Sequence, residues 1–207
     1  MQECDFCSNS IDFHEIVECI ASALDAKDPY TAGHSRRVSD MALVVCRLME
    51  LKEEDTEKIH IAGHLHDIGK IGVPDAVLNK EGKLTDEEFA FIRKHPQIGA
   101  DILNKSHQLR ELSEIVLMHH ERYDGKGYPT GAKGTEIPVG ARILAICDSI
   151  DAMTSNRCYR KALSFKYCYG EIEKNLGKMY DPIIGQYVLD KWEEVISVVK
   201  NSNECDK

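Results

Sequence analysis

The 207-residue sequence has no uninterrupted apolar run of about 18 residues, so it encodes no membrane span. Its first residues, MQECDFCSNS, also lack the basic start and the apolar stretch of a signal peptide. We therefore expect a cytoplasmic protein. Internal repeats and low-complexity segments are missing as well, and the length suits one domain, or one domain with a short appendage.

The sequence also lacks an excess of basic residues. It has 26 Lys and Arg against 35 Asp and Glu, for a formal net charge of −9. Non-specific binding to long nucleic acid needs a broad basic surface, so the composition argues against that function. It does not exclude a small phosphate ligand that a few local cations hold.

The chain has eight cysteines, but only one CxxC motif of the kind that binds zinc. Cys4 and Cys7 form a lone CxxC, and no second pair follows that would complete a tetrahedral zinc site. Several of the other cysteines sit inside apolar helical patterns, which favours reduced thiols over disulfides.

Alternation of strand type is missing, and helical periodicity dominates. For example, Val38, Met41, Ala42 and Val45 recur at helical spacing. The fold class predicted is an all-α bundle of about eight helices, comprising a domain over residues 11–200 between a polar N-terminal tail (1–10) and a C-terminal tail (201–207). The expected helices are 11–25, 31–51, 54–68, 85–103 (opened by a Thr85–Glu88 capping box), 109–121, 138–155, 165–176 and 183–199.

Histidines and aspartates interrupt these apolar patterns on five of the expected helices. A buried carboxylate is strongly disfavoured unless it is paired or bound to metal, and a protonated imidazole less so. Together the residues suggest one shared cation site, and imidazole with carboxylate suits iron, manganese or zinc. The predicted ligands are His34, His66, Asp67, His95, His119, His120 and Asp148.

Two of these residue pairs are adjacent in the chain, His66–Asp67 and His119–His120. Neighbours on a helix point about 100° apart, so each pair is expected to straddle two ions instead of chelating one. The two oxygens of Asp67 would bridge the ions. Two metals about 3.5–4 Å apart lower the pKa of a water between them, and the resulting hydroxide attacks phosphorus.

The segments HLHDIGK, KHP, HHERYDGKGYP and DSIDAMTSNRCYRKAL resemble the HD-GYP domains, a branch of the HD superfamily of metal-dependent phosphohydrolases. The resemblance runs from about Asp28 to Trp192, and the ordered motifs are specific. It implies an all-helical HD fold and hydrolysis of cyclic di-GMP to linear pGpG, in some members on to GMP. It also implies two or three metal ions, often iron or manganese.

Site roles follow from the same resemblance. The seven residues named above match the family's ligands, and Lys70 matches the lysine beside the attacked phosphate, where an ammonium offsets charge. Arg157 and Arg160 match the residues that grip the ligand phosphates. Gly127 and Tyr128, in the DGKGYP loop, are expected to lie beside the ligand. Members with three metals have a glutamate where this chain has Tyr30, so we expect two ions, with iron favoured and manganese the alternative.

Several residues keep two interpretations. His60 and His64, four apart, form either a second metal site or a helix surface with one hydrogen-bonded histidine, and His14 is interpreted as a surface residue. Glu121 either positions a ligand histidine or ends its helix. Asp151 either holds a loop by hydrogen bonds or acts directly. Likewise, His34 is either a ligand or a helix cap, and the basic turn at Arg157 either grips phosphate or is simply solvated.

Other functions also stay open at this point. A domain with the same ligand could sense a cyclic dinucleotide without cutting it. Some HD-fold proteins use a mixed-valent di-iron centre to activate oxygen, and others hydrolyse simple nucleotides; the DGKGYP loop disfavours both. A homodimer or a diguanylate cyclase is the expected protein partner.

Overall fold

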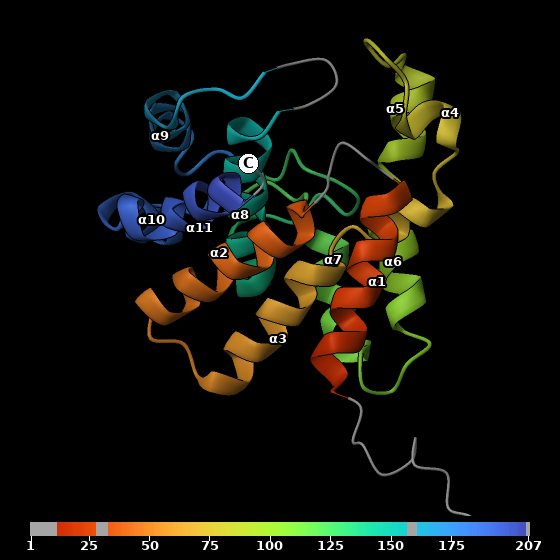
Figure 1. Ribbon diagram of the computed structural model, residues 1–207, viewed down its shortest axis with the longest axis horizontal. Coiled ribbons are helices and arrows are strands. Elements are labelled where there is room, and N and C mark those ends of the chain that lie inside the picture. Colours follow the sequence, from red (N-terminus) through yellow and green to blue (C-terminus); the bar gives the residue numbers. More distant parts are fainter. Residues whose placement is uncertain (1–11, 28–32, 157–160, 206–207) are drawn as a thin grey trace, which may run out of the picture.

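The computed structural model describes residues 12–27, 33–156 and 161–205, with no side-chain description beyond residue 202. Within these ranges the chain is helical and forms no strand, so the all-α prediction is confirmed (Figure 1). The helices are α1 (Phe13–Lys27), α2 (His34–Leu48), α3 (Glu53–Leu65), α4 (Asp75–Leu78), α5 (Asp86–Ile92), α6 (His95–Leu103), α7 (Ser113–Met118), α8 (Val139–Thr154), α9 (Phe165–Lys174), α10 (Pro182–Asp190) and α11 (Trp192–Cys205), with a 3₁₀ turn η3 (Ile68–Gly72) after α3.

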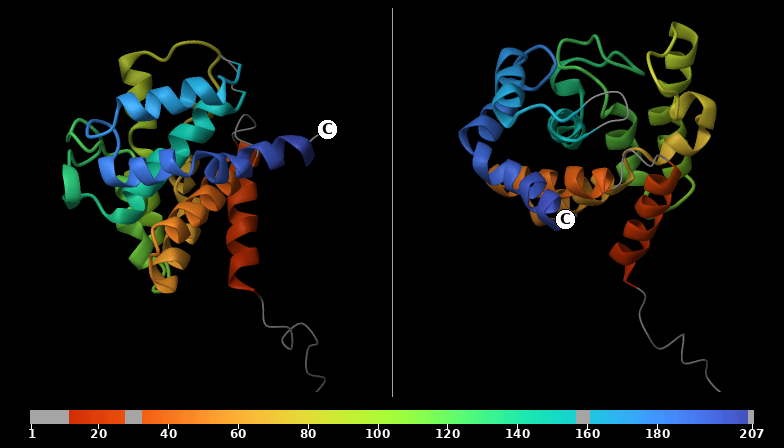
Figure 2. Two further views of the ribbon diagram at one scale, coloured as in Figure 1. Left: turned by 90° about the vertical axis from the view of Figure 1, so that its left-hand side faces the viewer. Right: turned by 45° about the horizontal axis from the view of Figure 1, so that its top comes forward.

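Helices α2, α3, α7 and α8 form the centre of the bundle. Helix α2 packs against both α3 and α8, α7 packs against α6 and α8, and α11 crosses α2 (Figure 2). The apolar residues that predicted α2 face this core, because Val38, Met41, Ala42 and Val45 are at most 1% exposed. Full burial of a side chain such as Met41 contributes about 1.5–3 kcal/mol.

One predicted helix, 85–103, is two helices in the structure. The expected capping box opens α5, where Glu88 N donates to Thr85 Oγ1 and Thr85 N donates to the Glu88 carboxylate. The chain then breaks at residues 93–94, because Pro96 fits the first turn of a helix and not its interior. The break makes His95 the first residue of α6.

The C-terminal helix predicted over 183–199 is also divided. Asp181 caps α10, since its side chain accepts hydrogen bonds from Ile183 N and Ile184 N. The helix ends at Asp190, and α11 runs on to Cys205, into the segment predicted as a C-terminal tail. The N-terminal tail, with Cys4 and Cys7, lies outside the described residues.

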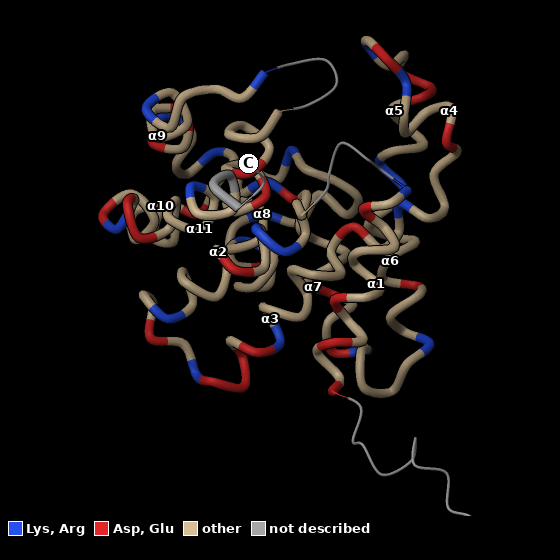
Figure 3. Tube along the Cα trace, viewed as in Figure 1, with Lys and Arg blue, Asp and Glu red and all other residues tan. Residues whose placement is uncertain are grey.

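Basic and acidic residues are mixed along the described chain (Figure 3). Lys and Arg are scattered among Asp and Glu on most elements (Figure 3). Of the helices in the described ranges, none is long and apolar enough to cross a membrane.

Candidate metal centre

The structure brings all seven predicted ligands together in two neighbouring groups. One group holds Asp67, His95, His119 and His120, and the other holds His34, His66 and Asp148; within each group the ligand atoms lie within 4.8 Å of one another. Most of these residues stand at helix ends, and they come from α2, α3, α6, α7 and α8 and the turns after α3 and α7. Helices α2, α6 and α8 contribute residues from within their bounds, whereas the other four residues follow the ends of α3 and α7, where continuous helix had been expected.

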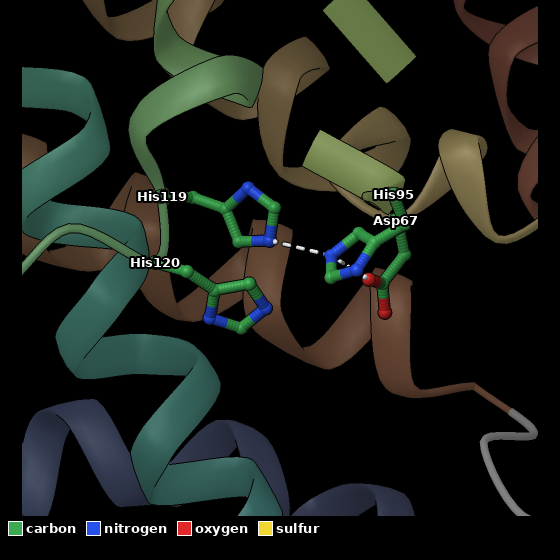
Figure 4. A group of neighbouring side chains, drawn as sticks. All are labelled: Asp67, His95, His119 and His120. Atoms are coloured by element: carbon green, nitrogen blue, oxygen red, sulfur yellow. Dashed lines mark hydrogen bonds and ion pairs between the residues drawn. The ribbon is translucent and has the colours of Figure 1, made fainter. Parts of the chain in front are cut away.

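The Asp67 carboxylate lies between the two groups. Its Oδ1 is 3.2 Å from His95 Nε2, whereas its Oδ2 is 3.4 Å from His66 Nε2 and 3.6 Å from His34 Nε2. Figure 4 shows Asp67 facing the three histidines of its own group. One oxygen thus faces each group, the arrangement that a bridging carboxylate requires.

Three of the imidazoles are oriented by the backbone of the preceding turn. In each, Nδ1 donates to the carbonyl oxygen three residues earlier, which leaves the lone pair of Nε2 directed into the centre. Such a hydrogen bond at the other ring nitrogen is typical of metal-binding histidine. The pairs are His66 with Gly63 (2.7 Å), His95 with Ile92 (2.7 Å) and His119 with Val116 (2.6 Å).

His34 is oriented by a carboxylate instead. Its Nδ1 donates to Asp151 Oδ2 at 2.7 Å, and Arg37 donates to the same carboxylate. Although burial raises the pKa of Asp151, hydrogen bonds from His34 and Arg37 outweigh it and hold that pKa well below its usual range. His34 Nε2 points to Asp148 Oδ1, 3.4 Å away. His34 is therefore not a side-chain cap of α2, whose N-cap is Gly33.

We predict that Asp151→Asn lowers the affinity for divalent metal by about 10–100-fold, because the loss of a carboxylate behind a ligand histidine has this effect. Competition with a chelator measures the affinity. Asp124→Asn is the matched control, since Asp124 also pairs with an arginine, Arg122, within its own loop. Equal affinities in the two variants would contradict the positioning role of Asp151.

Burial keeps two histidines of the group around Asp67 in the neutral form that binds a cation. Burial lowers the pKa of His119, and the neighbouring His120 lowers it further. Burial also lowers the pKa of His120, to about 4. Burial would raise the pKa of Asp67, but Lys70 and His66 more than offset it and hold that pKa well below its usual range. At neutral pH the two histidines are therefore neutral and Asp67 is charged, as metal binding requires.

The donor set also fits a metal by the position of His66. Its Nε2 is buried and lies 3.4 Å from Asp67 Oδ2, which is long for a hydrogen bond. A cation bound by both atoms would satisfy them more fully. Five imidazoles and two carboxylates suit iron, manganese or zinc.

The adjacent histidines differ from their prediction. His119 and His120 belong to the same group, so they do not divide between two ions as expected. Helix α7 ends at Met118, so His119 is its C-cap and His120 lies in the turn that follows, and the two rings converge to a centroid distance of 4.1 Å. Of the two adjacent pairs, only His66–Asp67 spans both groups.

The loop after His120 is folded back on its own start. A Cβ on Gly127 would lie 2.4 Å from Arg122 N and from Glu121 Cα, so only glycine fits there. Glu121 Oε1 accepts hydrogen bonds from Thr130 N, Thr130 Oγ1 and Gly131 N. Glu121 thus fastens this loop, and no hydrogen bond from its described atoms reaches a ligand histidine.

Tyr128 borders the centre. Its ring lies 4.9 Å from the His120 ring, and the Arg93 guanidinium lies 4.7 Å from its centroid, within cation–π distance. The sequence pattern gave no reason to select Arg93, which stands at the break between α5 and α6. Arg157, Arg160 and Tyr30 lie outside the described residues.

The Lys70 ammonium lies at the edge of the centre. Its Nζ is 2.8 Å from Asp67 Oδ2, and 18% of its side chain is exposed. Lys70 is therefore close to Asp67, which lies between the two ligand groups, and is partly open to solvent.

Arg37 and the exact role of Asp151 were missed in the sequence. A signal existed for both, since Asp148 and Asp151 lie three apart on α8 and His34 and Arg37 lie three apart on α2. Residues at that spacing share a helix face.

The chain resembles known proteins along most of its length. The HD domain family model matches residues 18–184. A cyclic di-GMP phosphodiesterase of Thermotoga maritima is 38% identical over 93% of this chain, and a 3′3′-cGAMP-specific phosphodiesterase of Vibrio cholerae is 34% identical over 89%. The chain spans 53% and 36% of the lengths of these two relatives.

The fold has solved counterparts. A cyclic GMP-AMP specific phosphodiesterase of V. cholerae superposes with a TM-score of 0.68 at 17% identity, over 89% of this chain and 50% of that one. The matched family model, the relatives and the order of the HDIGK and DGKGYP motifs agree. The chain therefore belongs to the HD domain family, in its HD-GYP branch.

Proposed function

We propose that this chain is a metal-dependent phosphodiesterase that hydrolyses one 3′–5′ bond of cyclic di-GMP to give linear pGpG. The observation that carries the proposal is the Asp67 carboxylate, which presents one oxygen to each of two ligand groups. The names of the relatives support a cyclic dinucleotide as substrate, either cyclic di-GMP or cyclic GMP-AMP.

Two divalent ions fit the two groups. Asp67, His95, His119 and His120 would hold one ion, and His34, His66 and Asp148 would hold the other, with Asp67 shared. When bound, such a pair supplies a water of lowered pKa as nucleophile and neutralises phosphate charge. We propose iron as the metal, with manganese as the alternative.

The protein's own residues would position and stabilise the substrate. Lys70 is close enough to Asp67 to reach a phosphate oxygen at the centre, where its ammonium would stabilise the charge that develops in the transition state. Tyr128, beside His120, would meet a base or phosphate that enters there. Gly127 would contribute by letting the loop close on its own backbone.

The direct test is incubation of the anaerobically purified protein with cyclic di-GMP and, separately, 3′3′-cGAMP. After reconstitution with Fe(II) or Mn(II), chromatography is expected to show a linear dinucleotide. If no metal yields a linear product, the phosphodiesterase proposal fails. Tight calorimetric binding without turnover would instead indicate a cyclic dinucleotide sensor.

Arg157→Ala should mainly raise the apparent Michaelis constant, by about tenfold or more. Removal of a hydrogen bond to a charged group costs about 1.5–3 kcal/mol, and we propose that Arg157, with Arg160, grips the ligand phosphates. Steady-state kinetics measures the effect, and Arg110→Ala, at an exposed position, is the control. A large fall in turnover at an unchanged Michaelis constant would show that Arg157 has another role.

A cytoplasmic location and a homodimer or diguanylate cyclase partner stay predictions of the sequence.

A further inference from the structure

A second cluster of histidines lies away from the centre described above. His14 of α1 meets His60 and His64 of α3, with one ring nitrogen of each within 4.8 Å of the others. Because two residues along a helix turn about 200°, His64 and His66 face nearly opposite sides of α3. The cluster therefore lies on the other side of α3 from the ligand groups around Asp67.

The sequence left two interpretations of His60 and His64 and placed His14 on the surface. The surface interpretation of His14 is wrong. Its ring is half-buried and stacks on His60, with centroids 5.2 Å apart and an interplanar angle of 9°. No periodicity could show this, since α1 and α3 are separated along the chain by the whole of α2.

Ser39 fixes which nitrogen of His60 carries the proton. Ser39 Oγ donates its one proton to the backbone oxygen of His60 at 2.6 Å. The Ser39 hydroxyl oxygen must therefore accept the hydrogen bond that it shares with His60 Nδ1, 2.7 Å away. Nδ1 therefore carries the proton, so Nε2 has a lone pair that either accepts a hydrogen bond from His14 Nε2 or binds an ion. That Nε2 faces His14 Nε2 at 3.1 Å, close to the separation of two nitrogens bound to one ion at about 2.0–2.1 Å.

His64 is the second, independent sign of a ligand. Its side chain is 1% exposed, and neither of its ring nitrogens has a hydrogen-bond partner among the described residues. Its ring meets those of His14 and His60 edge-on, at centroid distances of 5.2 and 4.9 Å. A buried imidazole with two unsatisfied nitrogens is costly, and a cation shared with the other two rings would satisfy one of them.

The surroundings leave room for a further ligand. A cavity of about 290 Å³ reaches His64, with Glu18 and Arg36 also on its wall. Asp40 lies within electrostatic reach of His60, Glu18 and Arg36, and the charge of Arg36 opposes a positive charge on His64. The carboxylates of Glu18 and Asp40 would offset the charge of Arg36 and part of the charge of an ion.

We propose that His14, His60 and His64 bind one transition-metal ion, and that this ion fastens α1 to α3. Three imidazoles with water in the fourth position suit zinc in particular. His14 lies outside residues 18–184, which match the family model, and none of the three histidines is among the ligands of the proposed phosphodiesterase centre.

Fastening α1 has a consequence for the segment that carries Lys70. At the far end of α1, Lys27 Nζ donates to Ile71 O at 3.0 Å and to Val73 O at 3.2 Å, and it pairs with Asp75. The ion would thus hold one end of α1 while Lys27 holds the other against the turn after Asp67.

The test compares wild type with His14→Ala and His107→Ala. His14 is at the start of α1 and only half-buried, so its loss should leave the fold intact; His107 is an exposed histidine and serves as the control. After equilibrium dialysis against zinc, mass spectrometry should find one zinc per chain fewer in His14→Ala than in wild type or His107→Ala. Zinc should also raise Tm less in His14→Ala than in the other two.

A second variant, His60→Ala, keeps the test valid if His14→Ala does not fold. His60→Ala should lose the same single equivalent, and circular dichroism checks that both variants are folded. Equal zinc content in wild type, His14→Ala and His60→Ala would overturn the proposal and leave a hydrogen-bonded histidine pair. All variants keep the ligands around Asp67, so the difference in zinc content is informative even if no cyclic dinucleotide is hydrolysed.

Discussion

Asp67→Ala is expected to lower the turnover of a cyclic dinucleotide by about 10³-fold or more and to lower the content of bound metal. The fold-change corresponds to about 4 kcal/mol of lost transition-state stabilisation, the order that metal catalysis supplies. The effect is expected to be large because the oxygens of Asp67 face both ligand groups, His95 through Oδ1 and His34 and His66 through Oδ2. Alanine leaves both groups incomplete.

Initial-rate kinetics and metal analysis on the same anaerobic preparation measure this result. Asp101→Ala is the matched control, because Asp101 is an exposed aspartate on α6 that contacts Gln97. Retention of full turnover and full metal content by Asp67→Ala would remove Asp67 from the centre. Loss of turnover with metal retained would give it a role other than bridging.

Gly69→Ala is expected to lower the free energy of unfolding by about 3 kcal/mol, at the upper end of what overpacking costs. A Cβ at this position would lie 1.8 Å from His95 O and 2.6 Å from Gly99 N, both of them backbone atoms of α6. The turn η3 would have to move away from α6, and His95 would move relative to Asp67. Metal affinity should therefore fall together with stability.

Urea unfolding measures this effect, with Gly170→Ala as the control. Gly170 lies within α9, is exposed, and has open space where a Cβ would stand. Alanine there should raise the free energy of unfolding by about 0.5–1 kcal/mol, since glycine is unfavourable inside a helix. Wild-type stability in Gly69→Ala would contradict the close packing of η3 on α6.

The sequence was sufficient for the fold class and for the seven residues that converge around Asp67. Periodic apolar residues predicted the central helices, and polar residues within those patterns, such as Asp67 and Asp148, indicated where the helices meet. Both features depend on the local period of the chain, which is visible in one sequence. The order of the HDIGK and DGKGYP motifs added the family.

Features that depend on how helices pack were not visible. The grouping of His119 with His120 depends on where α7 ends, and a helix end is uncertain by a residue or two. The contact between His14 and His60 depends on the docking of α1 against α3. The break before His95 was the exception, because Pro96 is a local signal that the prediction of a continuous helix overlooked.

An anomalous-scattering map from crystals grown anaerobically with Fe(II), collected at the iron edge, tests the two-ion centre most directly. We expect two peaks, one on each side of the Asp67 carboxylate, one among His95, His119 and His120 and the other among His34, His66 and Asp148. A single peak, or none near Asp67, would contradict the account.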